Sequence, residues 1–149
     1  MTDHRKAAFY ARTMHTPDSP QRAELRAALR DTSRQLIGLH RALIDTAKED
    51  FALATGAAPT PNELLRLLTD DPFFAWLKPM TALIVEIDEM ARTDFEPADA
   101  HAIGERLGAM FDATAAGPFA THYIPFLQRS VDIAIAHAAL RTAMGKLRK

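Results

Sequence analysis

The chain has 149 residues, of which 48% are hydrophobic and 25% are charged, with 18 Lys and Arg, 19 Asp and Glu, and no cysteine. This length suits one globular domain, because a chain of this size buries roughly 70% of its unfolded surface. The lack of cysteine excludes disulfides, zinc thiolate sites, iron–sulfur clusters and thiol nucleophiles. Alanine contributes 28 residues, which favours helix.

The charges are unevenly spread along the chain. Residues 1–48 hold nine Lys or Arg against five Asp or Glu, residues 49–112 hold four against thirteen, and residues 113–149 hold five against one. We expect the acidic middle to pack beside the basic flank of the first helix, which carries Arg22, Arg26, Arg30, Arg34 and Arg41. Internal pairing of this kind argues against an extended surface for nucleic acid.

Helix starts are marked by a capping residue followed by proline at Thr60, Asp71 and Glu96. Proline suits the first helical turn, and an acidic residue three positions after the cap completes a capping box. With Pro20 and Gly117 as further boundaries, the pattern predicts helices over 20–54, 61–69, 72–93, 97–114 and 119–147, interrupted near Pro79 and Pro125. Residues 1–17 are predicted to form a loose arm or short helix ahead of one domain, 18–149.

The first predicted helix carries leucines at 25, 29, 36, 39 and 43, which follow alternating steps of four and three with Thr32 filling the gap. On a helical wheel they fall within about 80°, which is the seam of antiparallel bundle packing. Ile37, Ile44 and Phe51 widen this apolar surface in the second half. We therefore expect an all-α bundle of four main helices with a corner broken by proline.

The last predicted helix is apolar almost all round. One stripe comprises Leu127, Val131, Ile135 and Ala138, and another comprises Phe126, Ile133, Leu140 and Met144. Such a helix is either central in the bundle or shared with a second copy. The sequence therefore predicts a homodimer.

A candidate ligand pocket or partner groove is predicted around the aromatic block of residues 64–79. Aromatic side chains at a helical corner make concave apolar sites, although the same block also fits a packed corner. The residues proposed for this site are His40, Phe73, Phe74, Trp76, Glu86 and His137. Glu86 alternatively pairs with an arginine of the first helix, and the two histidines are alternatively buried and hydrogen-bonded.

Metal and catalytic sites find little support in the sequence. A di-metal bundle site needs Glu-x-x-His pairs on several helices, and the chain has none. No metal or cofactor is therefore predicted. The sequence leaves open whether a metal ion is bound by His40, His101, His122 or His137. Arg34 and His40 match the Arg-x4-6-His spacing of the HEPN ribonucleases, in which the histidine works at the scissile phosphate. On a regular helix, however, these two side chains point about 120° apart.

The block from Glu63 to Glu89, with ELLRLL, DPFFAWL, KP and ALIVEIDE, resembles a segment of an uncharacterised family of small all-helical bacterial proteins. The stretch from Leu39 to Phe51 fits the same pattern. Together they cover about a third of the chain. The resemblance implies a helical bundle and a bacterial source, and it supplies no catalytic residues.

The sequence as a whole predicts a non-catalytic interaction or regulatory protein that self-associates. The longest apolar stretch, residues 81–85, falls far short of the ~20 residues that a membrane helix needs. The N-terminus lacks the apolar core of a signal peptide, so we expect a cytoplasmic protein. The alternatives are a small-ligand or metal-binding bundle and a HEPN-like ribonuclease.

Overall fold

The computed structural model describes residues 18–112 and 114–148, so the predicted arm over residues 1–17 lies outside the described residues. The helices are α2 (Pro20–Thr55), α3 (Pro61–Asp70), α4 (Pro72–Ala75), α5 (Lys78–Arg92), α6 (Pro97–Met110), α7 (Pro118–Arg129), α8 (Val131–Gly145) and the short 3-10 helix η1 (Lys146–Arg148). These described residues form helices and no strand, which confirms the all-α prediction.

The predicted helix starts are confirmed by the capping hydrogen bonds. The Thr60 hydroxyl accepts from the Glu63 N–H, and the Asp71 carboxylate accepts from the Phe73 N–H. At α6 the Asp99 carboxylate accepts from the Glu96 N–H. These contacts span three residues or fewer, and for this reason the local sequence was enough to predict them.

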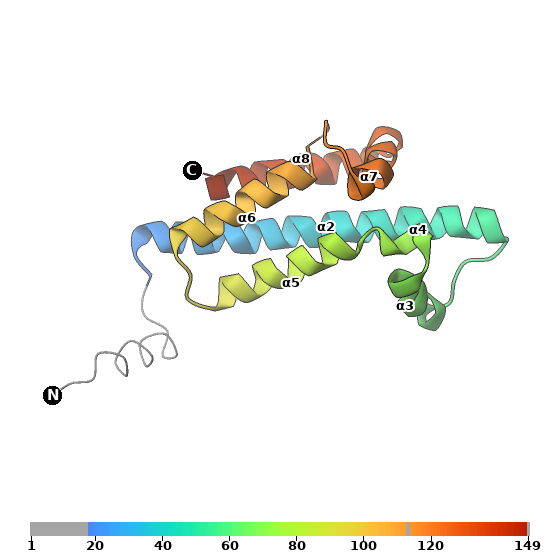
Figure 1. Ribbon diagram of the computed structural model, residues 1–149, viewed down its shortest axis with the longest axis horizontal. Coiled ribbons are helices and arrows are strands. Elements are labelled where there is room, and N and C mark those ends of the chain that lie inside the picture. Colours follow the sequence, from blue (N-terminus) through green and yellow to red (C-terminus); the bar gives the residue numbers. More distant parts are fainter. Residues whose placement is uncertain (1–17, 113, 149) are drawn as a thin grey trace.

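The long helix α2 is the spine of the molecule (Figure 1). Helix α5 packs along one side of α2, while α8 and α6 pack along the other. Helix α7 lies against α8, and α3 with α4 forms a hook at the C-terminal end of α2. Gly56 ends α2 in the left-handed conformation, with φ of 86°, and lets the chain turn back towards α3.

The core follows the predicted leucine seam, whose five members are all buried along α2. Leu36, Leu39 and Leu43 are fully buried. They belong to a continuous apolar cluster that also holds Met80 and Ile87 of α5. Thr32 interrupts the seam, and its buried hydroxyl has no hydrogen-bond partner among the described residues.

Three predicted helix boundaries differ from those in the structure. The last segment breaks at Ser130 and not at Pro125, which lies inside α7. Ser130 adopts an extended conformation, and its hydroxyl accepts from the Ile133 N–H to start α8. At the corner the chain breaks at Trp76 and Leu77, so that Pro79 falls in the first turn of α5, where a missing N–H costs nothing. Helix α6 also ends earlier than predicted, at Met110.

The predicted ion pairs between the arginine flank of α2 and the acidic middle of the chain do not form among the described residues. Among the described residues, no ion pair joins an α2 arginine to helices α3 to α6. Arg26 is buried and binds the carboxylate of Asp18 and the carbonyl oxygens of Ala91 and Thr93. Arg34 pairs with Asp31 on its own helix. The basic flank is therefore mostly solvated, apart from this one buried guanidinium.

No helix in the described part of the chain is long and apolar enough to cross a membrane.

Candidate functional site

The six residues predicted to form one pocket lie in separate places. Phe74, Trp76 and His137 are buried in the core, and Phe73 lies at its edge. His40 is half-buried between α2 and α5, and Glu86 is exposed on the outer side of α5. The structure therefore does not bring the set together around one cavity.

The aromatic block forms a packed corner. The Trp76 ring stacks on the His122 ring at 5.4 Å between centroids, and its Nε1 donates to the carbonyl oxygen of Phe73. Phe119 and Phe126 of α7 pack against the same indole. These ring contacts hold α7 against the segment around α4. The aromatic block is therefore the packed corner that the sequence offered as the alternative to a pocket.

His137 is buried and hydrogen-bonded, which confirms that alternative for this residue. Its Nδ1 lies 2.5 Å from the Tyr123 hydroxyl. Burial raises the pKa of Tyr123 above its ordinary value of 10. Burial, and then the nearby Arg141, lowers the pKa of His137 below 6.5. Both groups are therefore neutral at neutral pH, and one hydrogen bond joins the tyrosine hydroxyl to the imidazole, with its donor set by the histidine tautomer.

Glu86 does not pair with an arginine of the first helix. Its carboxylate accepts from the Arg106 guanidinium of α6 at 2.7 Å, and both side chains are about half exposed. Glu105 of α6 makes a similar pair with Arg148. Two ion pairs thus join α6 to other elements, and Glu86 belongs to the one with α5.

The metal and ribonuclease arrangements are not assembled. Among the described residues, no three His, Asp or Glu side chains come together as a metal-binding group. Arg34 turns to Asp31, whereas Nε2 of His40 lies 3.0 Å from the Thr81 hydroxyl on α5. The two residues of the HEPN-like spacing therefore have different partners on different sides of α2.

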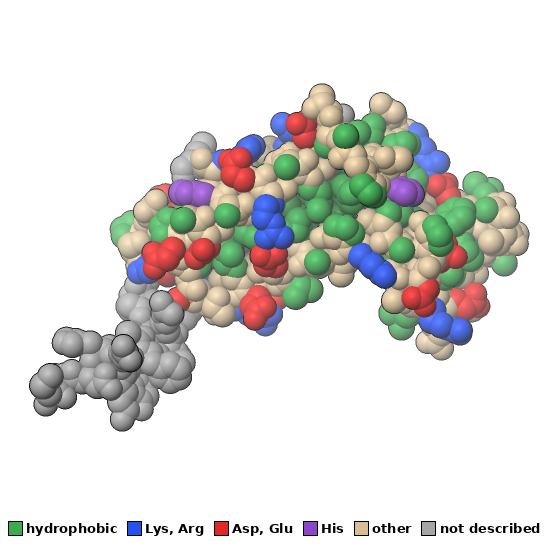
Figure 2. Space-filling view, viewed as in Figure 1, with side chains coloured by type: hydrophobic (Ala, Val, Ile, Leu, Met, Phe, Trp, Pro, Cys, Tyr) green, Lys and Arg blue, Asp and Glu red, His purple; other side chains and the backbone are tan. Residues whose placement is uncertain are grey.

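One candidate surface is a groove between α3 and α5, with His40 in its lining. Its volume is about 430 Å³, and the walls include Leu68, Leu77, Ala82 and Val85. In Figure 2 the lower outline of the molecule is notched between α5 and the α3 hook. Burial lowers the pKa of His40 below 6.5, so the imidazole adds no charge to this groove at neutral pH.

A second candidate surface is the exposed side shared by α2 and α8, named here the α2/α8 face. It comprises Ala42, Thr46 and Leu53 of α2 with Val131, Ile135 and Thr142 of α8. Three large apolar side chains stand out into solvent on it: Leu53 is 85% exposed, Val131 74% and Ile135 63%. Thr46, Leu53 and Val131 line one common groove. Exposed aliphatic groups gathered on one side mark an interaction surface.

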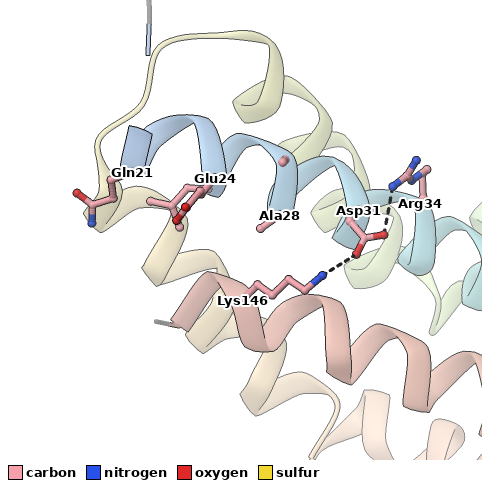
Figure 3. A pocket seen from close by; sticks show the side chains of 8 residues that line it. Gln21, Glu24, Ala28, Asp31, Arg34 and Lys146 are labelled. Atoms are coloured by element: carbon pink, nitrogen blue, oxygen red, sulfur yellow. Dashed lines mark hydrogen bonds and ion pairs between the residues drawn. The ribbon is translucent and has the colours of Figure 1, made fainter. Parts of the chain in front are cut away.

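Each end of the α2/α8 face carries an ion pair between α2 and a residue that flanks α8, Arg129 at the end of α7 or Lys146 at the start of η1. Asp50 pairs with Arg129 at one end. At the other end Asp31 accepts from Arg34 and lies 3.9 Å from the Lys146 ammonium, beside a shallow groove along α2 (Figure 3). Glu49 and Asp132 line the same groove as Leu53 and Val131, so the face combines exposed aliphatic side chains with charged ones.

Sequence reasoning found part of this face and missed the rest. The stripe containing Val131 and Ile135 was predicted as a candidate for contact with a second copy. Leu53 was missed, because a single leucine in the last turn of a helix gives no periodic signal. Asp31 and Lys146 were missed because their proximity depends on how α2 and η1 pack.

Comparison with protein-family models, with curated proteins and with solved structures finds no match for this chain. The resemblance of the Glu63–Glu89 block to a bacterial helical family therefore stays a prediction, as does the bacterial source.

Proposed function

We propose that this protein is a non-catalytic interaction module that self-associates through the α2/α8 face. The observation that carries the proposal is the exposure of Val131 and Ile135 on the outer side of α8. These β-branched side chains stand one helical turn apart on the same side, beside Leu53 of α2. Burying aliphatic side chains of this size contributes about 1.5–3 kcal/mol each.

The remaining surface supports the choice of this face. On α5 and α6, charged side chains are paired with one another, as in Glu86 with Arg106. Between its terminal ion pairs the α2/α8 face carries no such pairs among the described residues, and its exposed Val131 lies in a groove that also holds Glu49 and Asp132. Protein interfaces combine apolar side chains with a polar rim, and this face has both kinds.

The test is the mass of the protein in solution for a double variant, Val131→Glu and Ile135→Glu. Static light scattering across a concentration series should give a dimer for the unaltered chain and a monomer for the variant. Val85→Glu is the matched control, because Val85 is 60% exposed on α5, away from this face. That control should remain a dimer, and a monomeric unaltered chain at roughly 100 µM would refute the proposal.

A second candidate function is binding of a small apolar ligand in the α3/α5 groove. Its volume of about 430 Å³ lies within the usual range for ligand pockets, and its walls are mainly aliphatic. The fluorescent apolar probe 8-anilinonaphthalene-1-sulfonate should bind there, and Ala82→Trp should fill the groove and abolish binding. Unchanged fluorescence in that folded variant would exclude this groove as the binding site.

A further inference from the structure

We propose that the second copy lies on the α2/α8 face with its α8 against α2 and its α2 against α8, so that the twofold axis runs parallel to these helices. This inference rests on the proposed self-association and adds the arrangement of the two copies. It follows from three properties of the face: its register, its shape and its charge.

The register is fixed by the two ion pairs within the chain. Asp31 stands level with Lys146, and Asp50 stands level with Arg129. The levels between these ends follow by counting back from Lys146 along α8, which is antiparallel to α2 and rises equally per residue. The span 31–50 has two residues more than the span 129–146, because the extended Ser130 between Arg129 and α8 covers more length than a helical residue. Gln35 is level with Thr142, Ala42 with Ile135, and Thr46 with Val131.

The shape of the face is complementary to itself in this arrangement. On α8 the protruding groups are Val131 and Ile135. On α2 the residues at the same levels, Thr46 and Ala42, are small. Gly38 is exposed beside them, and a Cβ placed there would meet nothing within 4 Å. A second copy with its α8 on α2 therefore places side chains that protrude against positions that are small or open.

The charges distinguish this arrangement from the alternative. With the axis parallel to the helices, Lys146 meets the partner's Asp31, and Arg129 meets the partner's Asp50. With the axis perpendicular to the helices, α2 meets α2, so that Asp31 faces the partner's Asp50 and Lys146 faces the partner's Arg129. Like charges placed opposite one another across an interface disfavour it, so the first arrangement is selected.

The area of the face is sufficient for a dimer of low affinity. The levels from Asp31 to Asp50 extend about 28 Å along the helices, and two packed helices are roughly 20 Å wide. Each copy would bury roughly 600 Å², or about 1,200 Å² in total, at the lower end of stable interfaces. The expected dissociation constant is therefore in the micromolar range. Both α3 hooks would lie at the same end of the dimer, because the two copies keep the same direction.

Engineered cysteines test the arrangement, because the chain has no cysteine of its own. Single variants Gln35→Cys and Thr142→Cys are mixed and then joined with a short bismaleimide. The proposed arrangement predicts a covalent dimer in the mixture, well above either variant alone. Ala138→Cys lies near the middle of α8 and should link to itself only if α8 faces α8. Val85→Cys, on the other side of the molecule, measures links from random collision.

The outcomes separate the two proposals. A link between positions 35 and 142 without a link between two copies of position 138 is the expected result. A strong link between two copies of position 138 overturns the arrangement and leaves self-association standing. A monomer by light scattering, with links no stronger than those of Val85→Cys, overturns both.

Charge reversal gives an independent readout of the same contacts. Lys146→Glu and Asp31→Lys each place like charges together in a homodimer of the proposed arrangement. Mixed with one another, they restore both attractive contacts, so the heterodimer should form roughly tenfold more tightly than either homodimer. In the perpendicular arrangement each variant alone would instead form a tighter homodimer than the unaltered chain, which would contradict the proposal.

Discussion

The two flanks of α2 differ in how their side chains are covered. On the flank towards α5, Arg26 binds two carbonyl oxygens and one carboxylate, and His40 reaches Thr81. On the opposite flank, at the α2/α8 face, Leu53 and Val131 stand in solvent. One flank is completed by the chain itself, and the other leaves apolar groups uncovered. Residues of the first flank should therefore set the stability of the fold, and residues of the second should set association.

The largest expected effect on folding comes from Arg26→Ala. The substitution removes the buried guanidinium that binds the carboxylate of Asp18 and the carbonyl oxygens of Ala91 and Thr93. We expect the free energy of unfolding to fall by about 3 kcal/mol, as measured by urea denaturation. Arg34→Ala is the control, because Arg34 is exposed on the same helix, and its effect should stay within about 0.5 kcal/mol. Equal losses for the two variants would show that the buried contacts of Arg26 carry no special weight.

The next largest effect on the free energy of unfolding should come from Tyr123→Phe. It removes the hydrogen-bond partner of the buried His137 and should lower the free energy of unfolding by about 2 kcal/mol. Replacing both residues, as Tyr123→Phe with His137→Leu, removes the unpaired nitrogen and should recover part of that loss. A double variant less stable than Tyr123→Phe would mean that packing around the imidazole, and not its hydrogen bond, dominates.

The pH dependence of stability follows from the two histidines. Burial lowers the pKa of His40 and of His137 below 6.5, so the unfolded chain binds more protons than the folded chain below that pH. Stability should therefore fall as the pH is lowered from about 6.5 to about 5, be level between about 7 and 9, and fall again above about 10, where the unfolded tyrosine ionises before the buried Tyr123. Asp112, whose pKa is lowered first by the Thr114 N–H, contributes only near and below 3.8. Urea midpoints that rise on acidification at fixed protein concentration would contradict this assignment.

The smallest expected effect is that of Glu86→Gln. The pair with Arg106 is exposed to water, so its loss should change the free energy of unfolding by less than about 0.5 kcal/mol. Association should be unchanged, because Glu86 lies on α5, away from the α2/α8 face. A weaker dimer in this variant, measured by light scattering, would place part of the interface on α5.

The features that the sequence predicted are those decided within a few residues. The caps at Thr60 and Asp71 depend on neighbours two or three positions away, and the leucine seam depends on one helical period. The break at Ser130 was missed because an extended residue between two apolar helices leaves no mark in hydrophobic periodicity. The position of Pro125 inside α7 shows that proline alone does not decide where a helix ends.

The candidate site was harder to predict because it depends on packing between elements. Glu86 meets Arg106 only because α5 and α6 are neighbours in the fold, 20 positions apart in the chain. The sequence predicted the same surroundings for His40 and His137. In the structure His40 lies in a surface groove, whereas His137 lies beside Tyr123 in the core. Only the stripe of Val131 and Ile135 could be recognised in advance, because its period is local.

The most direct test of the account is urea unfolding of the chain at two protein concentrations, well below and well above the micromolar range. Self-association links stability to concentration, so the midpoint of the unaltered chain should rise with concentration. Val131→Glu with Ile135→Glu should show no such rise and should match the unaltered chain at the low concentration. Arg26→Ala should unfold earlier at both concentrations and keep the rise. A midpoint independent of concentration in the unaltered chain would contradict the central claim that the α2/α8 face binds a second copy.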